Sequence, residues 1–328
     1  MALNYYIIEK EVLKMSNFIY ALNATIPVFF VILLGGLFKQ WNLINEEFTK
    51  VANKLVFQVC LPVLLFQDIA SSNIREDFDI RFSLYCMIVT TLCFFGIWGF
   101  AELVFKDKSV IGAFVQGSFR SSVAILGLAF VKNVYSDVGM TPLMLVSCVP
   151  LYNIYSVIVL TFRSSEKIEG ANPIKTAAKN IIKNPIIIAI FLGIPFALLD
   201  VEFPQIVTKT MGSISCLASP LALLAIGAGF EGKAAIKKLK PTLIGSSMKL
   251  IIQPLVFLPI AVWMGFRNQE LMAILIMLGS PTTSTSFIMA KQMKNDSILS
   301  ASIVVVTTLV SAVSLTLWIY VLKGLSLL

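Results

Sequence analysis

The chain has 328 residues, of which 57% are hydrophobic and only 13% are charged, and its mean hydropathy is +0.87. A soluble domain has about 25% charged residues, so this composition excludes an ordinary soluble protein and predicts one that lies in a lipid bilayer. The net charge is +8 and histidine is absent from the sequence, which excludes histidine-based metal sites, catalytic triads and proton relays. The basic residues lie in short loops between apolar stretches, a topology signal that argues against nucleic-acid binding.

Hydropathy along the chain predicts an all-α polytopic membrane protein, because apolar stretches of about 20 residues favour helices over the short alternating strands of a barrel. A polar N-terminal segment, residues 1–17, comes first. Ten transmembrane helices follow, at about 18–38, 51–70, 82–105, 109–131, 141–162, 184–200, 206–230, 242–265, 268–290 and 299–322.

The basic segment 163–183 is the longest connection and divides the chain into two halves of five spans, 18–162 and 184–328. With the N-terminus outside, the inner loops carry about twice as many Lys and Arg residues as the outer segments, which is the usual bias of cytoplasmic loops. We therefore predict a multi-pass protein of the cytoplasmic membrane, with both termini outside and the central loop in the cytoplasm.

The two halves resemble each other. Gly35 and Pro62 have the same separation as Gly193 and Pro220, and GSFRSS in the fourth span matches GSPTTS in the ninth. Farther on, Lys-Asn recurs after both motifs at the same separation, at 132–133 and 294–295. An odd number of spans places the second copy upside down in the membrane, and such inverted repeats are typical of secondary transporters, although channels can carry them too.

The ninth span holds an unusually polar run, SPTTSTS at Ser280–Ser286. Pro281 lacks an N–H and frees the carbonyl one turn earlier, so this helix is predicted to break near its middle, with the neighbouring hydroxyls as partners for the freed groups. Two breaks at symmetry-related positions predict a midplane binding site, and half-helix N-termini there suit an anion. The alternative is a proline kink whose hydroxyls only satisfy the backbone. The predicted break residues are Gly117, Gly127, Gly279 and Pro281.

Five segments carry a resemblance to a known family: FRSSVAILGLAF, VPLYNIYSV, SPLALLAIG, SPTTSTSFIMAKQMKND and VVVTTLVSAVSLTLW. They resemble the auxin efflux carrier family, which includes plant PIN proteins and bacterial carriers of small carboxylates such as malate or malonate. The resemblance covers nearly the whole chain, and the short central loop is similar to that of the bacterial carriers. It implies two inverted five-helix repeats with crossing broken helices four and nine, a fold similar to that of bile-acid sodium symporters. It also implies a scaffold of spans 1, 2, 6 and 7 that forms a homodimer, and a moving transport domain of spans 3–5 and 8–10.

The chain departs from the family pattern in span four, where N-x-G-F-x-G-x-P is common. Ser122 and Ala129 stand at the asparagine and proline positions, and Gly127 is retained. Helix four is therefore expected to break less sharply than in the family, and the ligand contact of that asparagine is not carried over.

Arg120 is the first candidate for binding the carboxylate of a substrate, because an isolated cation inside a span is unfavourable unless it is paired or hydrated. The alternative is a structural role, in which Arg120 pairs with an acid in the membrane or with a ring of backbone carbonyls. By resemblance Tyr152 and Asn153 face the substrate, whereas Asn153 in a structural role would join helices by hydrogen bonds. The predicted substrate-binding residues are Arg120, Ser118, Ser121, Ser122, Tyr152, Asn153, Ser280, Pro281, Thr282, Thr283 and Ser284.

The coupling ion stays open between Na⁺ and H⁺. Acids are scarce within the spans, and Glu102 is the best proton carrier, with a helical pair to Lys106 as the alternative. Sodium needs only hydroxyls and carbonyls, which Ser122 and Thr283 supply. Lys54 and Lys249 lie nearer the span ends and are expected to extend to the cytoplasmic interface. The cysteines are interpreted as small apolar residues that fill space between helices; they are Cys60, Cys86, Cys93, Cys148 and Cys216.

These features predict a secondary active transporter of a small organic anion. Its other expected partners are membrane lipid and a second copy of the chain, and no resident cofactor is expected. An anion channel, or a membrane sensor that binds without transport, is the second possibility. A membrane enzyme is disfavoured, because no H-E-x-x-H motif, G-x-S-x-G motif or catalytic pair of acids is present.

Overall fold

The computed structural model describes residues 19, 22–23, 25–71, 79–123, 131, 139–164, 173–199, 201–230 and 232–328. Within these ranges the chain is helical and contains no strand. Gly127, Ala129 and the Lys132-Asn133 pair lie outside the described residues, so the predictions made for them are not tested by the structure.

The helices of each half overlap the predicted spans. The first half contains a helix at Thr25–Gln40, then α2 (Glu46–Leu55), the π-helical turn η1 (Val56–Cys60), α3 (Leu61–Ala70), α4 (Ile80–Val104), the 3₁₀ turn η2 (Lys108–Val110), α5 (Ile111–Phe119) and α7 (Thr141–Phe162). The second half contains α8 (Pro173–Ile182), α9 (Pro185–Leu198), α10 (Gln205–Ser215), α11 (Ala218–Ala228), α12 (Gly232–Lys237), α13 (Leu239–Ser247), the π-helical turn η3 (Met248–Ile252), α14 (Gln253–Trp263), α15 (Asn268–Gly279), α16 (Thr285–Gln292) and α17 (Ser297–Gly324).

Six helical segments of the described chain are long and apolar enough to cross a membrane: Glu46–Ala70, Ile80–Val104, Thr141–Phe162, Gln205–Ala228, Leu239–Trp263 and Ser297–Gly324. Thr25–Gln40, Pro185–Leu198 and Asn268–Gly279 are apolar but shorter. The described part of the chain is thus all-helical and has the apolar segments of a multi-pass membrane protein, as the composition predicts. The arrangement as ten spans in two inverted repeats stays a prediction.

Irregular turns interrupt the long helices just before prolines. The turn η1 precedes Pro62, the turn at Cys216-Leu217 precedes Pro220, and η3 precedes Pro254. A proline leaves the carbonyl one turn earlier without its N–H partner, and π-helical turns accommodate such a mismatch inside a continuous helix. The sequence predicts kinks at Pro62 and Pro220, and both prolines follow an irregular turn.

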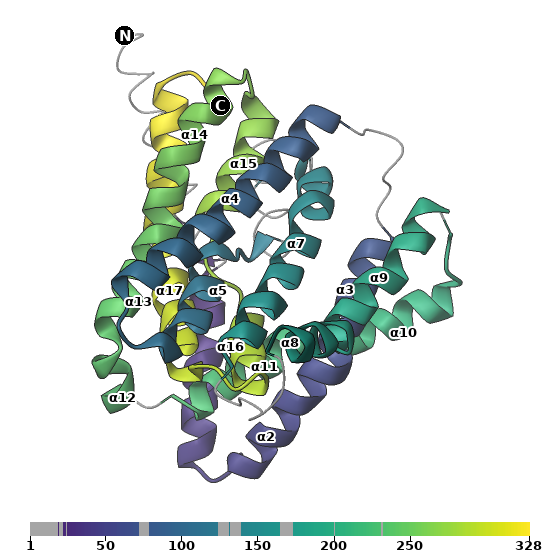
Figure 1. Cartoon of the computed structure of the whole chain (residues 1–328), viewed down its shortest axis with the longest axis vertical. Coiled ribbons are helices and arrows are strands. Elements are labelled where there is room, and N and C mark those ends of the chain that lie inside the picture. Colours follow the sequence, from purple (N-terminus) through teal and green to yellow (C-terminus); the bar gives the residue numbers. More distant parts are fainter. Residues whose placement is uncertain are drawn as a thin grey trace.

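The helices form two groups that pack mainly within themselves (Figure 1). In one group α3 packs against α9 and α10, and α11 packs against α2. In the other, α4, α5, α7 and α13–α17 pack together. The groups meet where α16 packs against α2, η1 and α11, and where α7 packs against α9. The assignment of the two groups as scaffold and transport domain, and the dimer, stay predictions.

Glycines permit one close helix crossing in the first group. A Cβ atom added to Gly227 of α11 would collide with the carbonyl of Ile32, and one added to Gly35 would collide with the carbonyl of Leu224. Small residues let two backbones approach in this way, and membrane proteins use such contacts because apolar burial does not drive helices together in lipid. The helix Thr25–Gln40 is thereby held directly against α11.

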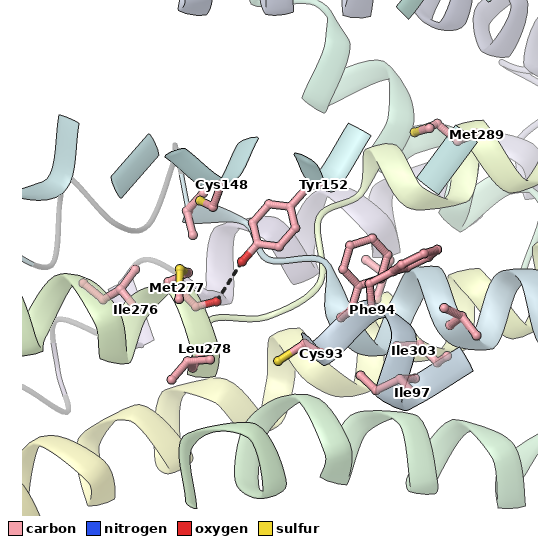
Figure 2. Packing of buried hydrophobic residues seen from close by; sticks show 14 of the residues in the cluster. Cys93, Phe94, Ile97, Cys148, Tyr152, Ile276, Met277, Leu278, Met289 and Ile303 are labelled. Carbon is pink, nitrogen blue, oxygen red and sulfur yellow. Dashed lines mark hydrogen bonds between the residues drawn. The ribbon is translucent and has the colours of Figure 1, made fainter. Parts of the chain in front are cut away.

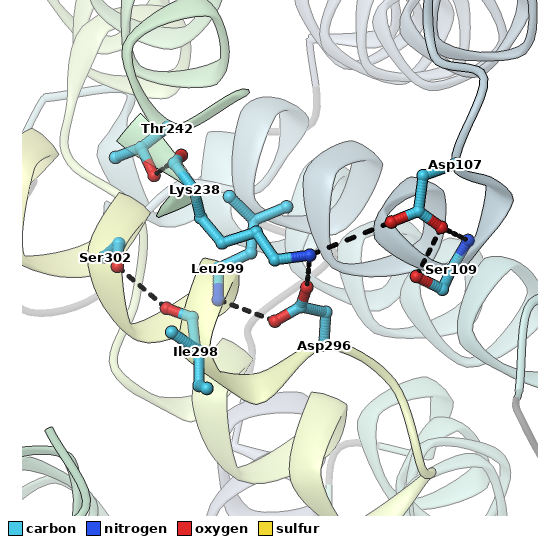
Figure 3. A network of polar contacts seen from close by, with 8 residues as sticks. All are labelled: Asp107, Ser109, Lys238, Thr242, Asp296, Ile298, Leu299 and Ser302. Atoms are coloured by element: carbon cyan, nitrogen blue, oxygen red, sulfur yellow. Dashed lines mark hydrogen bonds and ion pairs between the residues drawn. The ribbon is translucent and has the colours of Figure 1, made fainter. Parts of the chain in front are cut away.

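A polar network joins three connections at the end of the molecule that the lysine distribution assigns to the cytoplasm (Figure 3). The Lys238 ammonium lies 2.8 Å from a carboxylate oxygen of Asp296 and 3.8 Å from one of Asp107. Asp296 caps α17 by accepting from the N–H of Leu299 at 2.9 Å. Asp107 accepts from the hydroxyl and the N–H of Ser109, and these bonds hold the pKa of the Asp107 carboxyl below its usual value.

Candidate functional site

Two helices end in the middle of the second group, and extended chain follows each. Helix α15 ends at Gly279, and Ser280 is extended (φ −72°, ψ 155°) before α16 begins at Thr285. Helix α5 ends at Phe119, and Arg120 is extended (φ −77°, ψ 140°). The first break (Arg120–Ser122) forms without a proline at its own position, whereas the second (Ser280–Ser284) contains Pro281.

The two breaks are hydrogen-bonded to each other. The N–H of Ser122 donates to the carbonyl of Pro281 at 2.8 Å. The Thr282 hydroxyl donates to the carbonyl of Gly117 at 2.5 Å, and the Ser121 hydroxyl donates to that of Met277 at 2.5 Å. Each break therefore supplies a hydroxyl to a carbonyl near the end of the opposite half-helix, and the two segments form one unit.

The carbonyl of Met277 is the group that Pro281 leaves without an intrahelical N–H, because it lies four residues earlier. It accepts from the Ser121 hydroxyl, from the Tyr152 hydroxyl at 3.1 Å (Figure 2) and from the Lys249 ammonium at 3.3 Å. The sequence pointed to the hydroxyls of the Ser280–Ser286 run as its partners. The observed donors come instead from the opposite break, α7 and η3, because tertiary packing brings those elements to the carbonyl.

A cavity of about 330 Å³ adjoins the breaks. Residues from the predicted binding set line it on one side: Arg120, Ser121, Ser122, Tyr152, Asn153 and Thr283. The opposite side comes from the first group of helices, with Leu61, Leu64, Leu65 and Asp68 of α3 and with Ser215, Cys216 and Ser219 around the α10–α11 turn. The cavity thus lies between the two packing groups.

The remaining predicted binding residues support the breaks and do not line this cavity. Ser118, Ser280, Pro281 and Thr282 are buried, and Ser284 is half-buried just before α16. The carbonyl of Ser118 accepts from the Gln253 amide at 2.5 Å, and the N–H of Thr282 donates to the Thr307 hydroxyl at 3.1 Å. These bonds hold the extended segments in place, because extended backbone inside a membrane protein needs such partners.

Among the described residues that line this cavity, Arg120 alone carries a positive charge. Its side chain is 6% exposed, and one guanidinium nitrogen donates to the sulfur of Met289 at 2.8 Å. No ion pair in the described part of the chain includes it. A guanidinium has five N–H donors and a thioether is a weak acceptor, so most of its capacity is left for a bound anion.

Asn153 offers a complementary polar group in the same wall. Its amide nitrogen donates to the carbonyl of Val149 at 2.9 Å, which leaves the amide oxygen without a partner among the described residues. A buried acceptor without a donor is unfavourable, so a ligand hydroxyl or protonated carboxyl would satisfy it. The wall therefore combines one strong cationic donor with one free acceptor.

Two residues that line the cavity were not predicted from the sequence. Asp68 lies near the end of the second predicted span, 51–70, and was not among the predicted site residues, yet it lines the cavity together with Arg120. The signal available in the sequence was an acid inside an apolar span, which is rare without a functional reason. Cys216 is also exposed and lines the cavity, whereas Cys60, Cys86, Cys93 and Cys148 are buried as expected.

Glu102, the predicted proton carrier, lies at the end of α4 and does not line the cavity. Its carboxylate forms an ion pair with Arg163, lies 3.4 Å from the Lys108 ammonium and accepts from the Trp98 indole at 2.9 Å. Its partners are thus Lys108 and Arg163, where the sequence suggested Lys106. Its role in coupling stays a hypothesis.

A second, wider cavity of about 720 Å³ lies near the other end of the continuous helix Glu46–Ala70. It is lined by Lys39, Glu46, Glu47, Lys50 and Asn53 from the first group, and by Lys291, Gln292 and Lys294 at the end of α16. Helix α16 packs against α2, η1 and α11 between the two cavities. The molecule therefore has a polar cavity on each side of the contact made by α16.

Comparison with known proteins agrees with a transport protein. A family model described as a membrane transport protein matches residues 20–319. The uncharacterized transporter YfdV of Escherichia coli K12 is 25% identical over 315 residues, 92% of this chain and 97% of that protein. A putative malonate transporter of Rhizobium meliloti is 22% identical over 308 residues, 91% and 95% of the two chains. The uncharacterized transporter MJ1031 of Methanocaldococcus jannaschii is 20% identical over 309 residues, 92% and 98%.

The family match covers most of the chain, and it confirms the resemblance drawn from the motifs in spans four, five, seven, nine and ten. The relatives are matched over nearly their whole lengths. The chain belongs to the family of membrane transport proteins that contains the auxin efflux carriers.

Proposed function

We propose that the protein is a secondary active transporter that moves a small organic anion with a carboxylate group across the cytoplasmic membrane by alternating access. The family of membrane transport proteins supports the general activity. The relative named a putative malonate transporter makes a small dicarboxylate the first substrate to test.

The observation that carries this proposal is the buried, unpaired guanidinium of Arg120 at the wall of a cavity. A cation in such a place costs several kcal/mol unless an anion or water compensates it. Among the described residues its side-chain hydrogen-bond partner is the sulfur of Met289. A carboxylate in the cavity would accept two parallel N–H bonds from the planar guanidinium, the strongest geometry available to this pair.

The cavity is suited to a small molecule. Its volume of about 330 Å³ is at the lower end of the range for small-molecule sites, roughly 300–1,000 Å³. A short dicarboxylate in its monoanionic form would place its carboxylate on Arg120. Its protonated carboxyl would then face the amide oxygen of Asn153, which accepts, and the hydroxyl of Thr283. The apolar residues of α3 would then cover its carbon chain.

The two cavities support alternating access. We propose that the second group of helices, which carries both breaks, moves relative to the first, so that the site opens to one cavity and then to the other. In this scheme the first group is the scaffold that dimerises, and α16 forms the barrier that moves. Inverted-repeat transporters exchange access by such rigid-body movements.

Asp68 is the acid best placed to couple transport to protons. It lines the cavity from α3, on the scaffold side, while Arg120 lines it from the first break. It forms no ion pair with Arg120, so the guanidinium stays free for a substrate carboxylate. Once that carboxylate is bound, Asp68 would take up a proton, because two carboxylates in one small cavity repel each other.

The test is charge movement by purified protein in liposomes on a solid-supported membrane. Malonate, malate, succinate and indole-3-acetate are each applied with and without Na⁺ and at two pH values. We expect a saturable current for at least one acid. Unitary currents at channel rates would contradict the carrier.

The exposed Cys216 provides an independent test of binding, because the other four cysteines are buried. A membrane-permeant maleimide should label Cys216, and the transported acid should slow that labelling. Binding without any current, electroneutral exchange being checked by radiolabelled counter-flow, would identify a sensor rather than a carrier.

A further inference from the structure

Lys249 is a fully buried lysine that the proposed substrate cavity does not use. Its side chain has 0% exposure, and it lies in η3 in the middle of the helix Leu239–Trp263. The sequence suggested that it extends to the cytoplasmic interface. It points into the protein instead and lies outside the set of residues that line the cavity.

The ammonium of Lys249 donates to the carbonyl of Met277 at 3.3 Å. No carboxylate of the described residues forms an ion pair with it. Burying such a cation without a counter-charge is costly, and a methionine of similar length would fill the same space at lower cost. The charge itself therefore calls for an explanation.

The surroundings of the ammonium resemble the ligand set of a small monovalent cation. The Met277 carbonyl that accepts from Lys249 also accepts from the hydroxyls of Ser121 and Tyr152, so three donors gather at one carbonyl oxygen. Neutral carbonyl and hydroxyl oxygens are ligands that Na⁺ accepts.

The end of α15 adds a negative potential to this place. The last carbonyls of a helix carry a partial negative charge, and Pro281 leaves the Met277 carbonyl without its helical N–H. The π-helical turn η3 packs against α15, α5 and α17, and it widens the helix at the residues that include Lys249. Such turns are frequent at functional sites.

We propose that the ammonium of Lys249 is a tethered cation, which permanently occupies a monovalent-cation site formed by the end of α15, Ser121 and Tyr152. A site of this kind between two broken helices would otherwise require a dissociable ion such as Na⁺ to balance the helix end and hold the breaks together. Lys249 supplies that charge from the protein itself. The binding unit is then complete without Na⁺, and its charge moves with the second group of helices.

The experiment compares thermal unfolding of the purified full-length protein in chlorides of Na⁺, Li⁺, K⁺ and choline at equal ionic strength. Wild-type protein should show no Na⁺-specific shift of its unfolding midpoint. Lys249→Ala removes the ammonium and leaves its space, so Na⁺ or Li⁺ should raise the midpoint of this variant by a few degrees over choline, as a ligand of the folded state does.

Two variants serve as controls. Lys249→Met removes the charge but fills the space, so it should fold without a cation-specific response. Lys323→Ala removes a half-buried lysine of α17 that has no part in the site, and it should not acquire a response either.

The result that would overturn the proposal is a Lys249→Ala variant that is equally stable in all four salts, or a wild-type protein that is specifically stabilised by Na⁺. If Lys249→Ala folds only when purified in Na⁺ or Li⁺, this dependence of folding on a small cation also supports the cation site. If it folds in none of the salts while Lys249→Met folds, the site is not a cation site and the proposal fails. The readout is stability in the absence of substrate, so it stands apart from any test of transport.

Discussion

The N–H of Ser122 donates to the carbonyl of Pro281 at 2.8 Å, and this bond joins two helix breaks that lie far apart in the sequence. Ser121 and Thr282, the neighbours of these residues, donate to carbonyls of the opposite half-helices. The three bonds satisfy backbone groups that neither helix satisfies internally, which is the condition for irregular chain at membrane depth. A movement of one break therefore moves the other.

Arg120→Ala is expected to weaken binding of the transported acid about 10- to 100-fold, the loss of a charge-assisted hydrogen bond of roughly 1.5–3 kcal/mol. Arg120→Lys should recover only part of this affinity, because an ammonium lacks the planar pair of donors. Protection of Cys216 from maleimide by the acid measures the affinity. Arg267→Ala is the control, since that guanidinium bonds to the carbonyls of Val262 and Phe266 away from the cavity. Unchanged affinity in Arg120→Ala would mean that Arg120 has a structural role and does not bind the substrate.

Pro281→Ala is expected to fold but to transport more slowly than wild type. The new N–H would compete for the Met277 carbonyl with Ser121, Tyr152 and Lys249, and α15 would tend to extend through the crossing. The substrate-induced current in liposomes measures the rate. Pro259→Ala, inside α14, provides a matched loss of a helix proline elsewhere. Wild-type turnover in Pro281→Ala would mean that the break does not depend on the proline.

The sequence locates the breaks better than it identifies their partners. Pro281 and the serine and threonine residues around it are local signals, because the missing N–H acts within one turn of its own helix. The donors to Met277 are distant in the sequence, and hydropathy contains no information on which face of η3 carries Lys249. Lys249 lies in the π-helical turn η3 and is fully buried, so its predicted extension to the interface is wrong.

The residues that line the cavity also differ in whether the sequence alone could identify them. Arg120, Tyr152 and Asn153 were predicted because they are polar residues in spans that resemble the family's binding helices. Asp68 was overlooked because its position near a span end suggests contact with water. Only the packing of α3 opposite the first break places its carboxyl at the cavity.

Ser121→Ala and Thr282→Val should each lower the stability of the folded protein by about 1 kcal/mol, the usual net value of one buried hydrogen bond. The double variant should lose less than the sum, because both bonds hold the same crossing. Denaturant unfolding in detergent measures the differences. Ser213→Ala removes an exposed hydroxyl bond to the carbonyl of Lys209 and should have almost no effect. Strict additivity would show that the two breaks are independent.

Asp68→Asn should retain binding of the acid but remove the pH dependence of transport. The amide keeps the shape of the side chain and cannot take up a proton. The current is measured over a pH series with a fixed concentration of the substrate monoanion. Glu102→Gln is the comparison, because Glu102 lies in an ion pair outside the cavity. A pH profile that moves in Glu102→Gln and not in Asp68→Asn would transfer the coupling role to Glu102.

Lys238→Met should destabilise the protein, because it removes both ion pairs of the network in Figure 3. The pair with Asp107, whose side chain is 62% exposed, contributes little, so most of the loss should come from the pair with Asp296, whose side chain is 12% exposed. The effect should depend on pH in a defined direction. The pKa of Asp107 is lowered by its bonds to Ser109, so its contribution is present above the ordinary carboxyl pKa and is lost as the pH falls through the lowered value. The difference in unfolding midpoint between wild type and Lys238→Met should therefore be largest near neutral pH and shrink in acid. Lys237→Met, at the exposed end of α12, should show no such difference from wild type. A difference in unfolding midpoint between wild type and Lys238→Met that grows in acid would mean that Lys238 does not act through these carboxylates.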